Sequence, residues 1–228
     1  MKKRSKRYNG DSQKAVKEAL PLADAVIKVK SFNSTKFDQS VECALHLGID
    51  PKQADQMIRG AISLPHGIGK ARKVIAFCED SEADAAKAAG AIEAGCDDLI
   101  KKVSDGWMDF DVAIASPKVM GKAGKLGRVL GPQGKMPSPK NGTVTADVVT
   151  AVKDFAAGKV EFRNDAGGNI HAVVGKMSFD EKKLEENIQA FIEQIKKMKP
   201  SGLKGAYINK VAISGTMSPG VQVDMSAA

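Results

Sequence analysis

The middle of the chain alternates short apolar runs with helical segments, and this alternation restricts the fold more than any other feature. Residues 72–78 and 111–115 are short apolar runs of the kind found in strands that are buried on both faces. Helices are indicated over residues 81–94, over a glycine-broken segment at 117–129 and over residues 143–155. Strands that alternate with helices form a parallel sheet covered on both sides. The sequence therefore predicts a small Rossmann-like unit in this section.

The two ends of the chain show a different pattern, typical of antiparallel sheets with one solvated face. Residues 37–47 alternate apolar and polar side chains, as in a half-buried strand. Residues 159–162 and 170–174, separated by two glycines, indicate a hairpin. Residues 179–198 indicate a long amphipathic helix, and residues 207–213 a further strand.

Neither end has enough strands for a stable sheet of its own, so we expect the two ends to pair across the middle section. The predicted fold class is α/β, in two domains. Residues 1–67 and 159–228 would form a split α+β domain, and residues 68–158 an inserted Rossmann-like three-layer α/β/α domain. The connecting hinges are expected near residues 63–67 and near Gly158.

The charge of the chain favours an anionic partner. The formal net charge is +8, from 35 Lys and Arg against 27 Asp and Glu. Two stretches hold basic residues with no acid among them, the N-terminal arm and residues 117–141. Such stretches contact phosphates, although for the arm the alternative is a solubilising tail. The predicted secondary basic contacts are Lys3, Arg4, Arg7, Lys122, Lys125 and Arg128.

The sequence lacks the patterns of catalytic, cofactor and metal sites. No GxGxxG follows a strand, no GK pair completes a phosphate-binding loop, and the three histidines stand in separate segments. The three cysteines are widely spaced, which favours buried free thiols in a reducing cytosol. No apolar run is long enough to span a membrane, and the basic start lacks a signal-peptide core. We expect that the protein is not an enzyme and that it binds no cofactor or metal. The alternatives are a nucleotide-dependent enzyme and a sequence-tolerant DNA-binding module.

Residues 215–220 form the most distinctive turn of the chain. Two glycines and a proline specify it, and it exposes a threonine hydroxyl, backbone amides and a methionine thioether. The turn carries no charge and no catalytic group. On a basic protein, it indicates a surface that recognises the shape of another molecule.

A series of motifs occurs in order along the whole chain. They are KFD at 36–38, LGIDP at 47–51, ISLPHG at 62–67, GWMDFD at 106–111, LGP at 130–132, KMP at 135–137, EFRND at 161–165 and GTM at 215–217. Together these residues resemble the bacterial large-subunit ribosomal protein L-one family, which forms the mobile stalk beside the ribosomal exit site. The resemblance implies a protein that is cytoplasmic, ribosome-bound, and monomeric off the ribosome.

The same resemblance implies three partners. The split domain would grip a stalk helix of large-subunit rRNA. The protein would also assist the release of deacylated tRNA from the exit site. Finally, it would repress translation of its own operon by binding an mRNA leader that imitates the rRNA site.

The resemblance places an RNA-binding surface on the sheet of the split domain. A hydroxyl that bonds a 2′-hydroxyl, an exposed ring and basic side chains for phosphates suit the recognition of folded RNA. For Phe37 the alternative is packing in the core, and for Glu42 a buried ion pair with Arg163 is favoured over direct contact. The implied RNA-binding residues are Lys36, Phe37, Ser40, Glu42, Arg163, Asn164, Asp165, His171, Thr216, Met217, Ser218, Pro219 and Gly220.

Three positions depart from the family pattern. Ser218 stands at a usual glycine, Gln133 at a usual arginine and Ser138 at a usual asparagine. A Cβ at position 218 would hinder close approach of RNA to the backbone, whereas the serine hydroxyl could add a hydrogen bond. The other two changes weaken any transfer of function to the loop of the inserted domain.

Overall fold

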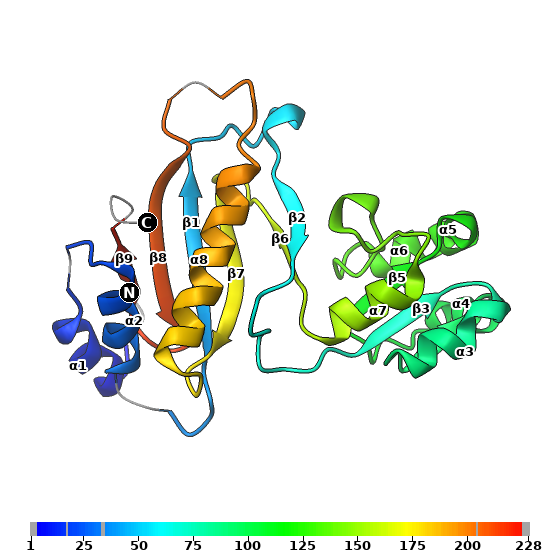
Figure 1. The fold of residues 1–228 in the computed structure, drawn as a ribbon, viewed down its shortest axis with the longest axis horizontal. Coiled ribbons are helices and arrows are strands. Elements are labelled where there is room, and N and C mark those ends of the chain that lie inside the picture. The colour runs from blue at the N-terminus through cyan, green and yellow to red at the C-terminus, as the bar shows by residue number, and fades with distance from the viewer. Residues whose placement is uncertain (1–3, 17, 33–34, 204, 225–228) are drawn as a thin grey trace. The chain divides into compact units, whose positions relative to one another are not determined.

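The chain is a mixed α/β protein that divides into two compact units (Figure 1). The terminal unit comprises the chain up to Gly69 and from Val160 onward, and the central unit comprises Lys70–Lys159. That these units are independent domains stays a prediction. Within the part of the chain that is described, no helix combines the length and apolar character needed to cross a bilayer. The computed structural model describes residues 4–16, 18–32, 35–203 and 205–224.

The terminal unit is built on an antiparallel four-stranded sheet with the order β7-β1-β8-β9. Its strands are β1 (Ser40–Leu47), β7 (Asn169–Lys176), β8 (Ile208–Gly215) and β9 (Val221–Val223). Because β1 lies between β7 and β8, Ala44 faces both His171 and Ala212. The two ends of the chain therefore pair with each other in a single sheet.

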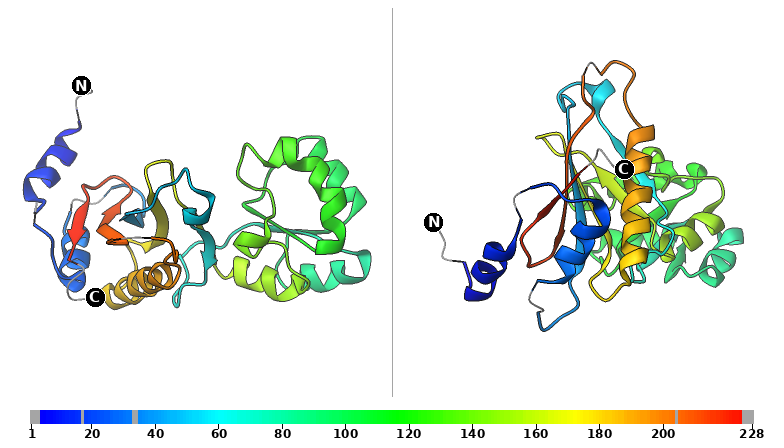
Figure 2. Two further views of the ribbon diagram at one scale, coloured as in Figure 1. Left: turned by 90° about the horizontal axis from the view of Figure 1, so that it is seen from above. Right: turned by 60° about the vertical axis from the view of Figure 1, so that its left-hand side comes forward.

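Helices α2 (Leu22–Lys30) and α8 (Glu181–Lys197) cover one face of this sheet (Figure 2). Every second side chain of β1 is buried, which explains the alternating sequence pattern. The apolar stripe predicted on α8 is buried from Leu184 to Ile195, so this prediction is confirmed. A third helix, α1 (Lys6–Lys14), follows Ser5, whose hydroxyl accepts a bond from Tyr8 N at 3.3 Å.

The predicted hairpin between residues 159 and 174 is confirmed only in part: both strands and the turn between them are present, but the first strand pairs mainly with another segment. β6 (Val160–Arg163) pairs with β2 (Arg59–Ile62) in a separate two-stranded sheet, and its link to β7 is the isolated bridge between Asn164 and Ile170. β2 has only four residues, too few for its alternation to be recognised as a strand, so the partner of β6 was not foreseen. Helices α1 and α2 and the short helix η1 (Ala54–Gln56) were not predicted either.

The central unit has a parallel sheet between two layers of helices. α7 (Val148–Ala156) packs with α3 (Asp80–Ala88) on one side of the sheet, while α4 (Asp97–Ser104) and α5 (Pro117–Ala123) pack on the other. The strands follow the order β4-β3-β5 and are β3 (Val74–Phe77), β4 (Glu93–Gly95) and β5 (Val112–Ala115). The helices are α3 (Asp80–Ala88), α4 (Asp97–Ser104), α5 (Pro117–Ala123), η2 (Gly124–Leu126), α6 (Gly127–Leu130), η3 (Pro139–Asn141) and α7 (Val148–Ala156).

Two helices of the central unit are shorter than the sequence predicts. α3 ends at Ala88, Gly90 has a positive φ of 114°, and residues 93–95 form β4 instead of a last helical turn. Pairing with β3 overrides the helical propensity of this alanine-rich segment. α7 begins only after Asp147, whose carboxylate accepts from Thr150 N at 3.1 Å. The glycine-broken helix is confirmed as the succession α5, η2 and α6.

Candidate nucleic-acid interface

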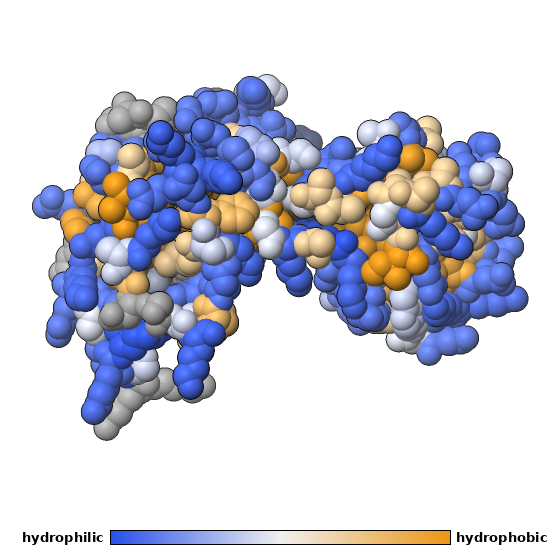
Figure 3. Space-filling view, turned by 60° about the horizontal axis from the view of Figure 1, so that its bottom comes forward, coloured by the Kyte–Doolittle hydropathy of each residue, from blue (hydrophilic) through white to orange (hydrophobic). Residues whose placement is uncertain are grey.

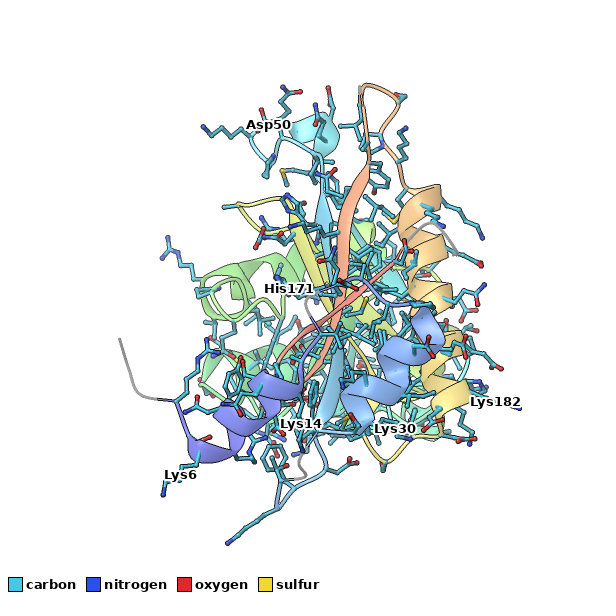
Figure 4. All side chains as sticks on the ribbon, turned by 90° about the vertical axis from the view of Figure 1, so that its left-hand side faces the viewer. Lys6, Lys14, Lys30, Asp50, His171 and Lys182 are labelled. Atoms are coloured by element: carbon cyan, nitrogen blue, oxygen red, sulfur yellow. The ribbon has the colours of Figure 1, made fainter. Side chains whose placement is uncertain are left out.

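One face of the four-stranded sheet is not packed against α2 and α8, and we call it the open face. Across its middle Ala44 lies between His171 and Ala212. The small side chains of the two alanines leave this part of the sheet accessible to a ligand. His171 lies on this side, away from Lys30 of α2 and Lys182 of α8 (Figure 4). The open face carries the side chains of Glu42, Ala44, His46, His171, Val173, Lys210, Ala212 and Ser214, all at least partly exposed.

Three segments meet at the end of the sheet where β1 begins, and we call them the tip. The tip comprises residues 36–40, 176–178 and 215–220. The carbonyl of Gln39 accepts from Met177 N at 2.8 Å, and the carbonyl of Ser40 accepts from Thr216 N at 3.0 Å. These backbone bonds bring together residues that lie far apart in the sequence.

Two large apolar side chains project from the tip. Phe37 is 54% exposed and Met217 is 50% exposed. The alternative that Phe37 packs in the core is therefore wrong. Lys36 is also exposed, next to Phe37. Seen from the side of the tip, the surface is mostly hydrophilic with small apolar patches (Figure 3).

The hydroxyl of Thr216 is bonded within the tip. Its Oγ1 accepts from Ser40 N at 3.1 Å and donates to Ser40 O at 3.2 Å. Lys176 Nζ donates to Ser40 Oγ at 3.0 Å, which holds the neighbouring side chain. A hydroxyl has one proton and two lone pairs. Thr216 can therefore still accept a bond from a 2′-hydroxyl, but its own proton is already used.

The hydroxyl of Ser218 is directed into the turn. Its Oγ accepts from Gly215 N at 2.8 Å and lies 3.3 Å from the carbonyl oxygen of Pro219. No described residue other than glycine has a positive φ, so serine at 218 causes no backbone strain. Pro219 is buried, whereas Gly220 is exposed. Ser218 thus stabilises the turn and does not present a free hydroxyl to a ligand.

The predicted residues at the opposite end of the sheet shape the chain between β6 and β7. Asn164 is buried, and its Oδ1 accepts from Ile58 N at 2.9 Å. Asp165 Oδ1 accepts from Gly167 N at 2.8 Å and from Asn169 N at 2.7 Å. Hydrogen bonds from Asn169, first from its side chain, lower the pKa of Asp165. Asn164 and Asp165 therefore support the local backbone.

Two histidines lie beside this turn. His171 Nε2 is 4.0 Å from Asp165 Oδ2. His46 Nδ1 lies 2.8 Å from Asn169 Oδ1. Both rings are exposed and belong to the open face, where they can bond an incoming polar group.

An ion pair between Glu42 and Arg163 was expected, and within the described part of the chain this prediction is wrong. Glu42 lies on the open face opposite Val173 and Ser214, whereas Arg163 lies on β6 in the other sheet. No ion pair of the described chain joins the two side chains. Arg163 is exposed at the end of its strand, opposite Arg59, and can reach a phosphate.

The predicted basic contacts of the N-terminal arm differ in their surroundings. Lys3 lies outside the described residues. The guanidinium of Arg4 lies 4.4 Å from the centre of the Tyr8 ring. Arg7 forms an ion pair with Asp11 at 3.2 Å and also donates to the tip. From Lys6 onward the arm is the helix α1, for which no secondary structure was predicted.

The basic run of the central unit is partly neutralised. Lys122 Nζ lies 3.0 Å from both carboxylate oxygens of Asp97, and this contact raises the pKa of Lys122. Lys118 pairs with Glu79 at 3.3 Å. The acids that pair with these two lysines lie outside the basic run in the sequence but are adjacent to it in the fold. Lys125 and Arg128, the other predicted contacts of this run, are exposed.

Two tip residues were missed by the sequence analysis. Gln39 is 2% exposed, and its Oε1 accepts from Met217 N at 2.9 Å. Lys176 bonds Ser40. Neither belongs to a motif, and neither could be recognised without knowing which segments meet. The only available signals were that Gln39 lies two residues after Phe37 and that Lys176 is the last residue of β7.

Other kinds of site have little support in the described chain. No group of three or more His, Cys, Asp and Glu residues there could hold a metal ion. A cavity of about 820 Å³ lies in the central unit around β4, between Asp80 and Lys102.

Cys43 and Cys78 are buried free thiols as expected, whereas Cys96 is partly exposed. Burial raises the pKa of Cys43 to about 12, so this thiol is unreactive at neutral pH.

Comparison with known proteins identifies the class to which the chain belongs. The model of the ribosomal protein L1p/L10e family matches residues 29–219. The large ribosomal subunit protein uL1 of Rhodopirellula baltica is 58% identical over 223 residues, covering 98% of this chain and 99% of its own. The protein of the same name from Cutibacterium acnes is 50% identical over 227 residues, covering 99% and 98%. That of Thermobifida fusca is 48% identical over 226 residues, covering 99% and 96%.

These matches cover nearly the whole chain, including every segment that contributes to the open face and the tip. The predicted resemblance is confirmed, and it is to a family of ribosomal proteins rather than of enzymes. The chain belongs to the ribosomal protein L1p/L10e family.

Proposed function

We propose that this protein is a structural rRNA-binding component of the large ribosomal subunit stalk. The terminal unit would act as the RNA-binding domain, with the open face and the tip against a stalk helix of the rRNA. The observation that supports this most is the tip itself, where Phe37 and Met217 are half exposed beside an accessible sheet. The protein would be cytoplasmic, ribosome-bound, and monomeric off the ribosome.

The chemistry of the surface suits folded RNA better than duplex DNA. A ring and a thioether can cover a ribose or an unstacked base, which an RNA loop or bulge presents and a regular duplex does not. Lys36 next to Phe37 and Arg163 near the opposite end of the sheet are exposed and can contact phosphates. Glu42 and Thr216 offer acceptors for 2′-hydroxyls.

The family resemblance supports two further roles for the same protein. The first is assistance in the release of deacylated tRNA from the exit site, for which Lys125 and Arg128 of the central unit are exposed candidates. The second is repression of its own operon through an mRNA leader that imitates the rRNA. Since leader and rRNA would occupy the same surface, each should compete with the other for the tip.

A binding experiment with two matched methionine variants tests the proposal. Met217 and Met57 are both exposed, at 50% and 42%, but only Met217 belongs to the tip. Covering the exposed half of a methionine contributes about 1 kcal/mol, and a carboxylate near phosphates adds repulsion. We therefore expect Met217→Asp to weaken binding of a stalk rRNA fragment at least about tenfold. Met57→Asp should leave it unchanged.

The binding is measured by fluorescence anisotropy at a fixed salt concentration, with duplex DNA of equal length as competitor. Displacement of the rRNA by equal amounts of duplex DNA would favour a sequence-tolerant basic module. Equal affinity of the two variants for the rRNA fragment would show that the tip is not part of the interface.

A further inference from the structure

The backbone of Met217 is held from two sides by side chains of distant segments. Its N–H donates to Gln39 Oε1 at 2.9 Å, and its carbonyl accepts from Arg7 Nη2 at 2.6 Å. Gln39 is 2% exposed, so this acceptor is fixed by its surroundings. Arg7 belongs to α1, which makes the N-terminal helix part of the structure that sets the position of the tip.

Arg7 is in turn held by a buried acid one helical turn away. Arg7 Nη1 lies 3.2 Å from Asp11 Oδ2, and the side chain of Asp11 is 0% exposed. The side chain of Arg7 itself is 25% exposed. A planar guanidinium can bond a carboxylate with one nitrogen and a carbonyl with the other, which the ammonium group of lysine cannot do in the same geometry.

We propose that Arg7 is a positioning residue that holds Met217 for RNA recognition, and that it does not contact phosphate itself. The proposal rests on the proposed RNA-binding function of the tip. It reassigns Arg7 from the basic arm, where the sequence placed it among the phosphate contacts. The negative charge of Asp11 compensates the positive charge of the Arg7 guanidinium. Arg7 should therefore displace fewer counterions from RNA than an arginine without a neighbouring carboxylate.

The two roles predict different dependence on salt. Each phosphate contact that a protein makes releases counterions, so losing one makes the negative slope of log affinity against log salt shallower by about 0.9. Losing a positioning contact weakens binding at every salt concentration and leaves the slope unchanged. The slope therefore separates the two roles even when both weaken binding.

The experiment uses the full chain and a stalk rRNA fragment, titrated by fluorescence anisotropy over a series of KCl concentrations. Arg7→Ala should weaken binding about tenfold with an unchanged slope, and Arg7→Lys should not restore the affinity. Lys14→Ala is the matched control, because it removes one positive charge from an exposed position on the same helix. It should change the affinity less than about twofold. Figure 4 shows Lys6 and Lys14 on α1.

A second measurement keeps the proposal testable if Arg7→Ala loosens α1. NMR of methyl-labelled methionine reports the environment of the Met217 side chain in the free protein. Both Arg7→Ala and Gln39→Leu should shift and broaden the Met217 signal, while Lys14→Ala should not. If no form of the protein binds the rRNA, the proposed function fails, but this signal still tests the contact between Arg7 and Met217.

Three results would overturn the proposal. The first is a salt slope that becomes shallower by about 0.9 in Arg7→Ala while Arg7→Lys binds normally, as expected of a phosphate contact. The second is an equal loss of affinity in Lys14→Ala, which would indicate a general effect of charge. The third is an unchanged Met217 signal in Arg7→Ala.

Discussion

Replacing Thr216 with valine tests whether the tip depends on a side-chain hydrogen bond. Valine keeps the shape of the side chain and removes Oγ1, the acceptor of Ser40 N. The Ser40 carbonyl keeps its bond from Thr216 N at 3.0 Å. Thr143 offers a matched control, since its Oγ1 accepts from Ser138 N at 2.8 Å and donates to Ser138 O at 3.1 Å in the central unit.

The magnitude follows from the exposure of each site. A hydrogen bond contributes about 0.5–1.5 kcal/mol net, and water can replace a lost partner at an exposed site. Thr216 is exposed, so we expect its loss to cost about 1 kcal/mol of local stability, or roughly fivefold faster exchange of Ser40 N–H. Thr143 is 2% exposed, and water cannot easily replace its hydroxyl. Its substitution should therefore cost more, about 2 kcal/mol.

Hydrogen exchange by NMR and anisotropy titration with the rRNA fragment measure the two effects. Thr216→Val should speed exchange at Ser40 and weaken RNA binding about fivefold, and Thr216→Ser should restore both. Thr143→Val should destabilise the central unit and leave RNA binding unchanged. A weaker affinity of Thr216→Val with unchanged exchange at Ser40 would refute the reasoning, because the hydroxyl would then act only by direct contact with RNA and not by holding Ser40.

Two further substitutions test the terminal unit. A Cβ at Gly48 would lie 2.4 Å from the backbone oxygen of Ala206, so Gly48→Ala should lower the free energy of unfolding by about 2 kcal/mol, measured by urea denaturation. Hydrogen bonds from Asn169 lower the pKa of Asp165, so its carboxylate stabilises the fold above its ordinary pKa of 3.8. This stabilisation is lost as the pH falls through the lowered pKa, and melting curves below pH 4 should depend less on pH in Asp165→Asn; an identical dependence would contradict the role of the carboxylate.

Local periodicity explains why much of the fold could be predicted. The strand at 40–47 alternates because one face is buried in the core that also holds α2 and α8, and the apolar strands β3 and β5 lie between two helical layers. The predictions failed where pairing partners were distant. β4 was taken for the end of a helix, because its strand conformation depends on β3 and not on its own residues.

The residues of the candidate site also divide into those recognised from local sequence and those that depend on distant partners. Phe37 and Met217 were recognised from their motifs, and both project from the tip. Gln39 and Asp11 were not recognised, because a buried polar side chain is defined by its partner and carries no sequence pattern. The expected pair of Glu42 and Arg163 failed for the same reason, since the sequence does not show that these residues belong to different sheets.

By itself, the sequence determined the class of fold, the family and the turn at residues 215–220, since these depend on periodicity and on motifs of a few adjacent residues. Only the tertiary structure decided the use of each polar group in that turn. It directs the hydroxyl of Ser218 inward, engages the proton of Thr216 with Ser40, and brings Arg7 to the carbonyl of Met217 across 210 positions of sequence. The physical reason is that a hydrogen bond requires two groups at about 3 Å, and only the folded chain brings such distant residues together.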